Sequence, residues 1–148
     1  YHIIYNETLR DRVCAVSNKT HYNEMNVLSM HALIGAYQPQ GYEWVDELNE
    51  VIEGNVDYFC NYVDKHFAGV SYSRPQGTYM VFLDCTEWCR EHGRDIQWLL
   101  DEGARVGVGY QDGRPFHGPC HIRVNLALPL SRVREACDRL DHYVFNAQ

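Results

Sequence analysis

Apolar side chains recur every three or four residues through the middle of the chain, at Val45, Leu48, Ile52, Val56, Phe59, Val63 and Phe67. Acidic side chains occupy the opposite side of the same helical projection, at Asp46, Glu50, Glu53 and Asp57. This spacing fits the ~3.6-residue period of an α-helix with one apolar face. The pattern therefore predicts one long amphipathic helix from about Glu43 to His66.

The segments before this helix predict a strand and two further helices. Tyr1–Tyr5 is a short apolar run typical of a strand, and Asn6 is a favourable N-cap for a helix that extends to about Val16. Residues 17–20 are polar and predict a loop. Glu24–Tyr37 is too apolar on all sides for a surface helix, so it is either a core helix or part of an interface between domains or subunits.

The second half of the chain predicts a small sheet with helices packed on it. Strand-like runs lie between Gly- and Pro-containing segments, at residues 70–73, 78–83, 105–109 and 121–127. The strand at 78–83 is apolar on both sides, which predicts a central strand covered on both faces. Thr86 and Asp95 are N-cap candidates for two short helices, and Pro129 begins a last helix whose apolar stripe ends at Tyr143. This order of elements predicts an α+β fold.

The strand at 121–127 carries the most informative polar side chains. Ile122, Val124 and Leu126 alternate onto one face, which leaves Arg123 and Asn125 on the other. An arginine in the middle of a strand needs an anionic partner, because an unpaired buried guanidinium is very costly. Its planar fork matches a carboxylate through two parallel hydrogen bonds. From the residues alone two interpretations stay open: an ion pair within the protein, or a binding site for a carboxylate ligand.

Composition and charge exclude several classes of protein. The 148 residues carry 13 Lys and Arg against 20 Asp and Glu, and the resulting formal charge of -7 is unfavourable for a nucleic-acid-binding protein. No apolar run approaches the ~20 residues that span a membrane, and the N-terminal sequence lacks the features of a secretory signal. We therefore expect a cytoplasmic protein whose partners are neither nucleic acid nor membrane.

The six cysteines allow two other interpretations. An even number can form disulfides in a secreted protein, but helical patterns around several of them favour reduced, buried thiols. His117, Cys120 and His121 are potential zinc ligands close in sequence, but their spacing differs from a paired Cys-x2-Cys site. We expect no metal site, and zinc at Cys120 and His121 is the least favoured alternative.

Several motifs follow one another in a specific order and spacing: Pro75-x-Gly77-Thr78-Tyr79, Leu83-Asp84, Gly107-Val108, Gly113-x2-Phe116 and Arg123-x-Asn125-x-Ala127-x-Pro129. Ala32–Tyr37 with Glu43 and Trp44 precedes them. Together they resemble the C-terminal part of pyridoxal-phosphate-dependent enzymes of the aspartate-aminotransferase fold. Within these, the chain is most similar to the cystathionine β-lyase (MalY/PatB-like) branch of the class I/II aminotransferases.

The resemblance implies a role for individual residues and a division of the chain. Arg123 matches the arginine that binds the α-carboxylate of the substrate. Tyr79 and Asn125 match positions near the mouth of the active site, where the resemblance favours a packing role for Tyr79 and a structural role for Asn125 in holding the strand and loop in register. Residues 1–41 would end the large cofactor-binding domain, and residues 42–148 would form the small C-terminal domain with a mainly antiparallel sheet. The lysine that holds pyridoxal 5'-phosphate is expected upstream of Tyr1, so we expect this chain alone to be inactive.

Three functions remain open at the level of sequence. The resemblance favours a C–S β-lyase that converts L-cystathionine to homocysteine, pyruvate and ammonia. It also implies that this chain packs against the large domain of the same protein and that the complete protein is a homodimer. An aminotransferase acting on L-amino acids shares every residue named here. A non-catalytic, stand-alone domain with Arg123 in a structural ion pair is the alternative from another class.

Overall fold

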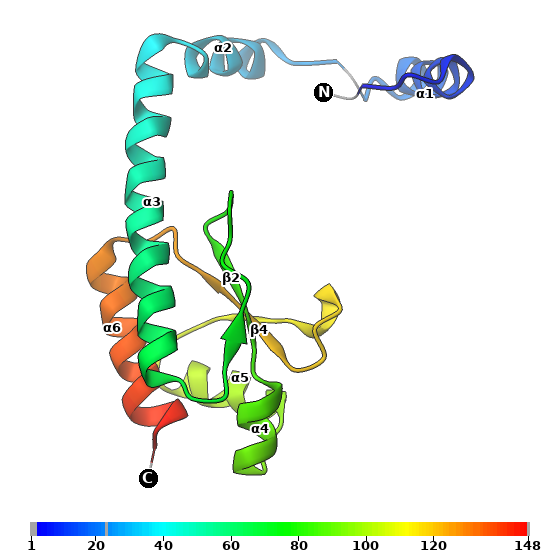
Figure 1. Ribbon diagram of the computed structural model, residues 1–148. Helices are drawn as coiled ribbons and strands as arrows, with labels where there is room; N and C mark the ends of the chain where they lie inside the picture. Colours follow the sequence, from blue (N-terminus) through cyan, green and yellow to red (C-terminus); the bar gives the residue numbers. More distant parts are fainter. Residues whose placement is uncertain (1–2, 23, 148) are drawn as a thin grey trace. The chain divides into compact units, whose positions relative to one another are not determined.

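The computed structural model describes residues 3–22 and 24–147. These residues contain a four-stranded antiparallel sheet and six α-helices (Figure 1). This composition confirms the predicted α+β fold. The chain divides into two compact units, residues 1–45 and 46–148. The assignment of residues 1–41 to a large domain stays a prediction.

Two helices and the start of a third form the first unit, with α1 at Glu7–Thr20 and α2 at Val27–Ala36. Asn6 caps α1 as predicted, because its Oδ1 accepts a hydrogen bond from the Leu9 amide at 2.9 Å. The predicted loop at residues 17–20 is wrong, since α1 continues through this segment. Of the predicted strand, Tyr1 and His2 lie outside the described residues, and residues 3–5 are not a strand because no described segment pairs with them.

Helix α2 keeps its apolar side chains exposed. Asn26 caps it by accepting a hydrogen bond from the Ser29 amide at 2.9 Å. None of the helix residues is buried, and Leu28 is 82% exposed. The segment is therefore not a core helix within the described residues, and its role in an interface stays a prediction.

Helix α3 spans Pro39–His66 and confirms the long amphipathic helix. It begins earlier than predicted, because Pro39 is compatible with the first turn of a helix, where its missing N–H has no partner to lose. The predicted apolar stripe is buried at Val56, Phe59 and Val63. Asn55 is also buried on this stripe, with an exposed fraction of only 1%.

The sheet has the strand order β1-β2-β4-β3, and all its neighbouring strands are antiparallel. Its strands are β1 at Ser71–Tyr72, β2 at Met80–Asp84, β3 at Gln111–Asp112 and β4 at His121–Asn125. The predicted strands at 70–73 and 121–127 are thus confirmed with shorter bounds, and the strand at 78–83 is confirmed with its bounds moved to 80–84. Strand β4 lies between β2 and β3, with Phe82 opposite Arg123 on one side and Gln111 opposite it on the other.

The remaining helical segments are α4 at Thr86–His92, α5 at Ile96–Arg105, a 3-10 turn at Arg114–Phe116, α6 at Leu130–Leu140 and a π-helical turn at Asp141–Phe145. Asp95 caps α5 as predicted, through a 2.8 Å hydrogen bond from the Trp98 amide. Thr86 is not the cap of α4 as predicted, because it is the first helical residue and Cys85 occupies the N-cap position. Among the described helices, none combines the length and apolar character needed to cross a bilayer.

Two predictions for the end of the chain are wrong. The predicted strand at 105–109 does not form, because α5 extends to Arg105 and the chain then turns at Gly107 with φ of 76°. Tyr143 does not continue the apolar stripe of α6 and is 51% exposed. The π-helical turn changes the residue spacing there, so Val144 and Phe145 enter the core instead.

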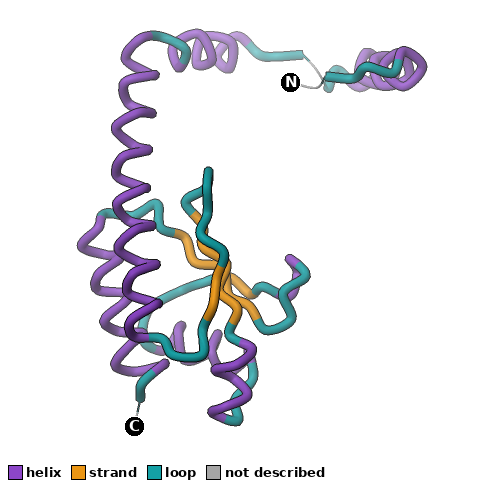
Figure 2. The backbone as a smooth tube through the Cα atoms, viewed as in Figure 1, coloured by secondary structure: helices purple, strands orange, loops and turns teal. Residues whose placement is uncertain are grey.

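The core lies on one face of the sheet. Helices α3 and α6 lie side by side on this face (Figures 1 and 2). Their side chains form one apolar cluster with those of the strands, which includes Phe59, Val63, Val81, Leu83, Ile122, Val124, Val133 and Cys137. On the other face Met80 and Phe82 are only half-buried, so the prediction that β2 is covered on both faces is wrong for the described residues. This less covered face carries Arg123.

Candidate functional site

Arg123 projects from the middle of β4 and is held by a neutral side chain. The register of β3 places Gln111 opposite it. Gln111 Oε1 accepts a hydrogen bond from Arg123 Nε at 2.6 Å and a second one from Nη2. One edge of the guanidinium is therefore fixed by an amide oxygen that carries no net charge.

An aromatic ring supports the same guanidinium from the loop between β3 and β4. Arg123 Cζ lies 4.0 Å from the centroid of the Phe116 ring, in the geometry of a cation–π interaction. The loop is closed by hydrogen bonds from the Gly113 amide to His121 O at 2.9 Å and from the Phe116 amide to Gly113 O at 2.9 Å. The loop thus sets the position of the ring relative to the strand.

The second edge of the guanidinium, formed by Nη1 and the outer hydrogen of Nη2, is free within the part of the chain that the structure describes. No carboxylate of residues 3–22 and 24–147 lies within salt-bridge distance of Arg123. The structural ion pair that the sequence left open is therefore absent among these residues. An edge with two parallel N–H donors suits a carboxylate ligand.

Asn125 and Tyr79 lie at the same end of the sheet but differ in their contacts. Asn125 shares the face of Arg123, and its Oδ1 accepts a hydrogen bond from the Ala127 amide at 2.8 Å. Tyr79 O accepts a hydrogen bond from the Leu126 amide at 2.8 Å, while the Tyr79 side chain is 38% exposed. Neither side chain contacts Arg123 through a hydrogen bond in the described residues, so their role at an active-site mouth stays a prediction.

Asn55 holds the segment that follows β4 and was not predicted as a site residue. Its Nδ2 donates hydrogen bonds to Leu126 O at 2.9 Å and to Leu128 O at 2.7 Å. These bonds tie the exit of β4 to helix α3. A polar residue within the apolar stripe of α3 is the sequence signal that identifies it.

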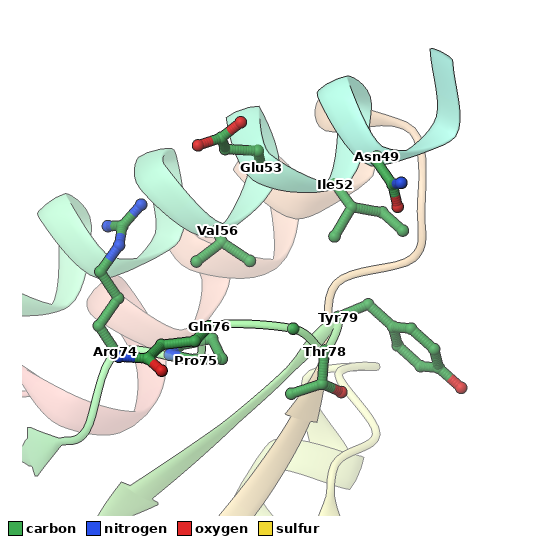
Figure 3. A pocket seen from close by; sticks show the side chains of 10 residues that line it. Asn49, Ile52, Glu53, Val56, Arg74, Pro75, Gln76, Thr78 and Tyr79 are labelled. Atoms are coloured by element: carbon green, nitrogen blue, oxygen red, sulfur yellow. The ribbon is translucent and has the colours of Figure 1, made fainter. Parts of the chain in front are cut away.

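A cavity of about 780 Å³ is lined in part by the motif at residues 75–79. Figure 3 shows it between α3, which contributes Asn49, Ile52, Glu53 and Val56, and the segment 74–79. Tyr79 points away from α3 in this view, and an ion pair between Arg74 and Asp57 lies at the other end. Of the predicted site residues, Tyr79 lines this cavity, whereas Arg123 and Asn125 do not.

His121 and Asp84 form a second polar pair on the face of Arg123. His121 Nε2 lies 3.8 Å from Asp84 Oδ2, and its ring packs on Phe82 at 4.6 Å between centroids. Burial acts to raise the pKa of Asp84, but hydrogen bonds from Thr86 outweigh it and leave the pKa below its usual value. Within the described residues no group of three His, Cys, Asp or Glu side chains is placed to hold a metal ion.

Comparisons with known proteins connect this site to a family. Residues 2–140 match the family described as "Aminotransferase class I and II". A protein of Mycobacterium leprae (strain TN) named "Putative cystathionine beta-lyase" is 33% identical over 122 residues, which cover 72% of this chain and 29% of that protein. A protein of Mycobacterium tuberculosis (strain ATCC 25618 / H37Rv) with the same name is 31% identical over 120 residues, covering 68% and 28%. The chain thus spans less than a third of these relatives.

Solved structures share the fold. The pyridoxal-phosphate-bound C-S lyase from Staphylococcus hominis matches with a TM-score of 0.77 and 24% identity over 94% of this chain and 36% of that one. Cystalysin from Treponema denticola, which contains pyridoxal 5'-phosphate, matches with a TM-score of 0.79 and 23% identity over 94% and 35%. The resemblance that the motifs indicate is confirmed: the chain belongs to the class I and II aminotransferase family.

Proposed function

We propose that this chain is part of a pyridoxal-phosphate-dependent C–S β-lyase, in which Arg123 binds the α-carboxylate of an L-amino acid. The observation that carries the proposal is the free edge of the Arg123 guanidinium on a half-covered sheet face. The reaction is the conversion of L-cystathionine and water to homocysteine, pyruvate and ammonia. The two relatives named as cystathionine β-lyases favour this reaction over transamination.

Arg123 acts by binding and orienting the substrate. Two parallel N–H···O bonds fix both oxygens of the α-carboxylate, and this fixes the direction of the α-carbon and its proton. The cation–π contact with Phe116 and the hydrogen bonds to Gln111 restrict the guanidinium before substrate arrives, which lowers the entropy lost on binding.

We expect the lysine that holds the cofactor to lie outside these 148 residues. Pyridoxal phosphate supplies an electron sink for the bond cleavage and is attached through a lysine amine. The two lysines of the chain, Lys19 and Lys65, are exposed in the last turns of α1 and α3. We propose that the lysine, a large domain and a second subunit belong to the complete protein, and that the 148 residues alone are inactive.

Substitution of Arg123 tests the carboxylate assignment in the complete protein. Arg123→Ala removes a charge-assisted, two-bond contact, so the stabilisation of the transition state should fall by about 3 kcal/mol, which lowers kcat/KM for L-cystathionine on the order of a hundredfold. Most of the effect should be a higher KM. Arg90→Ala is the matched control, because Arg90 is exposed on α4 and paired with Glu87. An unchanged kcat/KM for Arg123→Ala would refute the assignment.

The product distinguishes the lyase from the alternatives. A β-lyase supplied with pyridoxal phosphate and L-cystathionine releases pyruvate continuously without any added keto acid. Activity that requires a keto acid would instead identify an aminotransferase. Inactivity of the complete protein in both assays would favour the non-catalytic domain.

A further inference from the structure

We infer that Gln111 is a positioning residue that holds the Arg123 guanidinium in place while leaving its positive charge available to a substrate carboxylate. We call this function a neutral anchor. The inference rests on the proposed function of Arg123 and assigns a role to a residue outside the motifs of the family resemblance.

The geometry makes Gln111 a dedicated partner of Arg123. Strand β3 consists of only two residues, Gln111–Asp112, and its register on β4 places Gln111 directly opposite Arg123. A single oxygen, Gln111 Oε1, accepts from both Nε and Nη2. Both bonds use the side edge of the guanidinium, so the anchor leaves the outer edge to a ligand.

The neutral partner of Arg123 contrasts with the acidic partners of most other arginines among the described residues. Seven arginines form salt bridges with Asp or Glu among the described residues: Arg10, Arg74, Arg90, Arg105, Arg114, Arg132 and Arg139. A carboxylate is even adjacent to Gln111, but Asp112 is directed to Arg114, with Oδ2 accepting from Arg114 Nε at 2.7 Å. The strand alternation therefore keeps the nearest acid away from Arg123.

The neutral partner orients the Arg123 guanidinium without neutralising its charge. A carboxylate in the place of Gln111 would hold the guanidinium more strongly, because the attraction between opposite charges would add to the two hydrogen bonds. It would also cancel the charge that attracts the substrate. The neutral amide accepts both N–H groups and leaves the guanidinium with its full charge.

Gln111→Glu separates these effects because it changes charge while keeping size and both acceptor bonds. In the complete protein with pyridoxal phosphate, we expect KM for L-cystathionine to rise about tenfold or more with a smaller change in kcat, and the Tm to stay equal or rise. We expect sodium propionate, compared with sodium chloride, to raise the Tm of the parent protein but not that of Gln111→Glu. Gln111→Met keeps the size but removes the acceptor, so KM should rise less and the Tm should not rise.

Gln97→Glu is the matched control for added charge. Gln97 Oε1 accepts a hydrogen bond from Arg114 Nη2 at 2.8 Å, but Arg114 already pairs with Asp112. We expect this variant to keep the parent KM. Equal KM increases in Gln97→Glu and Gln111→Glu would overturn the inference, because a general effect of negative charge would then explain both.

Arg123→Ala distinguishes failure of the inference from failure of the proposed function. If Arg123→Ala raises KM and Gln111→Glu does not, the neutral anchor is wrong and the carboxylate assignment stands. If neither changes KM, the proposed function of Arg123 fails as well. If Gln111→Glu does not fold, Gln111→Met decides: an unchanged KM in that variant overturns the anchor.

Discussion

Replacement of Asn55 by leucine tests whether the exit of β4 depends on one buried amide. Asn55→Leu keeps the branched shape and the number of heavy side-chain atoms but removes the donor to Leu126 O and Leu128 O, which lie 2.9 and 2.7 Å from Nδ2. Each lost hydrogen bond costs about 1 kcal/mol net, and a buried carbonyl left without a partner adds about 1–3 kcal/mol. Leu128 O is only partly buried, so water can replace its lost bond. We therefore expect the free energy of unfolding to fall by about 2–4 kcal/mol.

Urea titration of the 148-residue chain, followed by tryptophan fluorescence, measures this loss, because Trp88 is buried in the core. Asn61→Leu is the control, since Asn61 lies on the same helix and is exposed, and its effect should stay within about 0.5 kcal/mol. If the two variants differ by less than about 0.5 kcal/mol, the two hydrogen bonds do not hold the exit of β4. In the complete protein Asn55→Leu should also raise KM, because the displaced segment follows directly from the strand of Arg123.

Two further predictions concern the loop beside Arg123 and the buried thiols. Gly118→Ala places a Cβ 2.5 Å from the Phe82 ring, so this variant should lower the Tm by several degrees. Gly109→Ala is the control, because its Cβ meets no atom within 4 Å and its Tm should not fall. Equal Tm values for the two variants would contradict this prediction. Burial raises the pKa of Cys89 and of Cys137 to about 12. A disulfide reagent in mildly alkaline buffer should therefore label both thiols only after unfolding. Fast labelling of either thiol in the native chain would refute this prediction. Because unfolded thiols lose their protons near pH 9, these two groups should lower the stability as pH rises from about 9 towards 12.

Elements with strong local signals could be predicted from the sequence. The stripe of α3 repeats over many turns, and the caps Asn6 and Asp95 bond to amides only three residues away. The errors occur where short signals compete. Residues 17–20 are polar, yet they continue α1. Arg105 has strand-like neighbours, yet it is the last residue of α5. In both cases the preceding helix determines the backbone conformation.

Alternation along β4 predicts that Arg123 leaves the core face, but it does not identify what lies opposite. That partner depends on the register of a two-residue strand, and the register is set by the loop that begins at Gly113 and carries Phe116. Gln111 by itself resembles any polar residue beside a glycine-rich loop. Its neutrality matters only because it bonds to an arginine twelve residues away. A family motif can therefore locate the arginine that binds a carboxylate, while the residue that keeps its charge available can be found only from the three-dimensional pairing of strands.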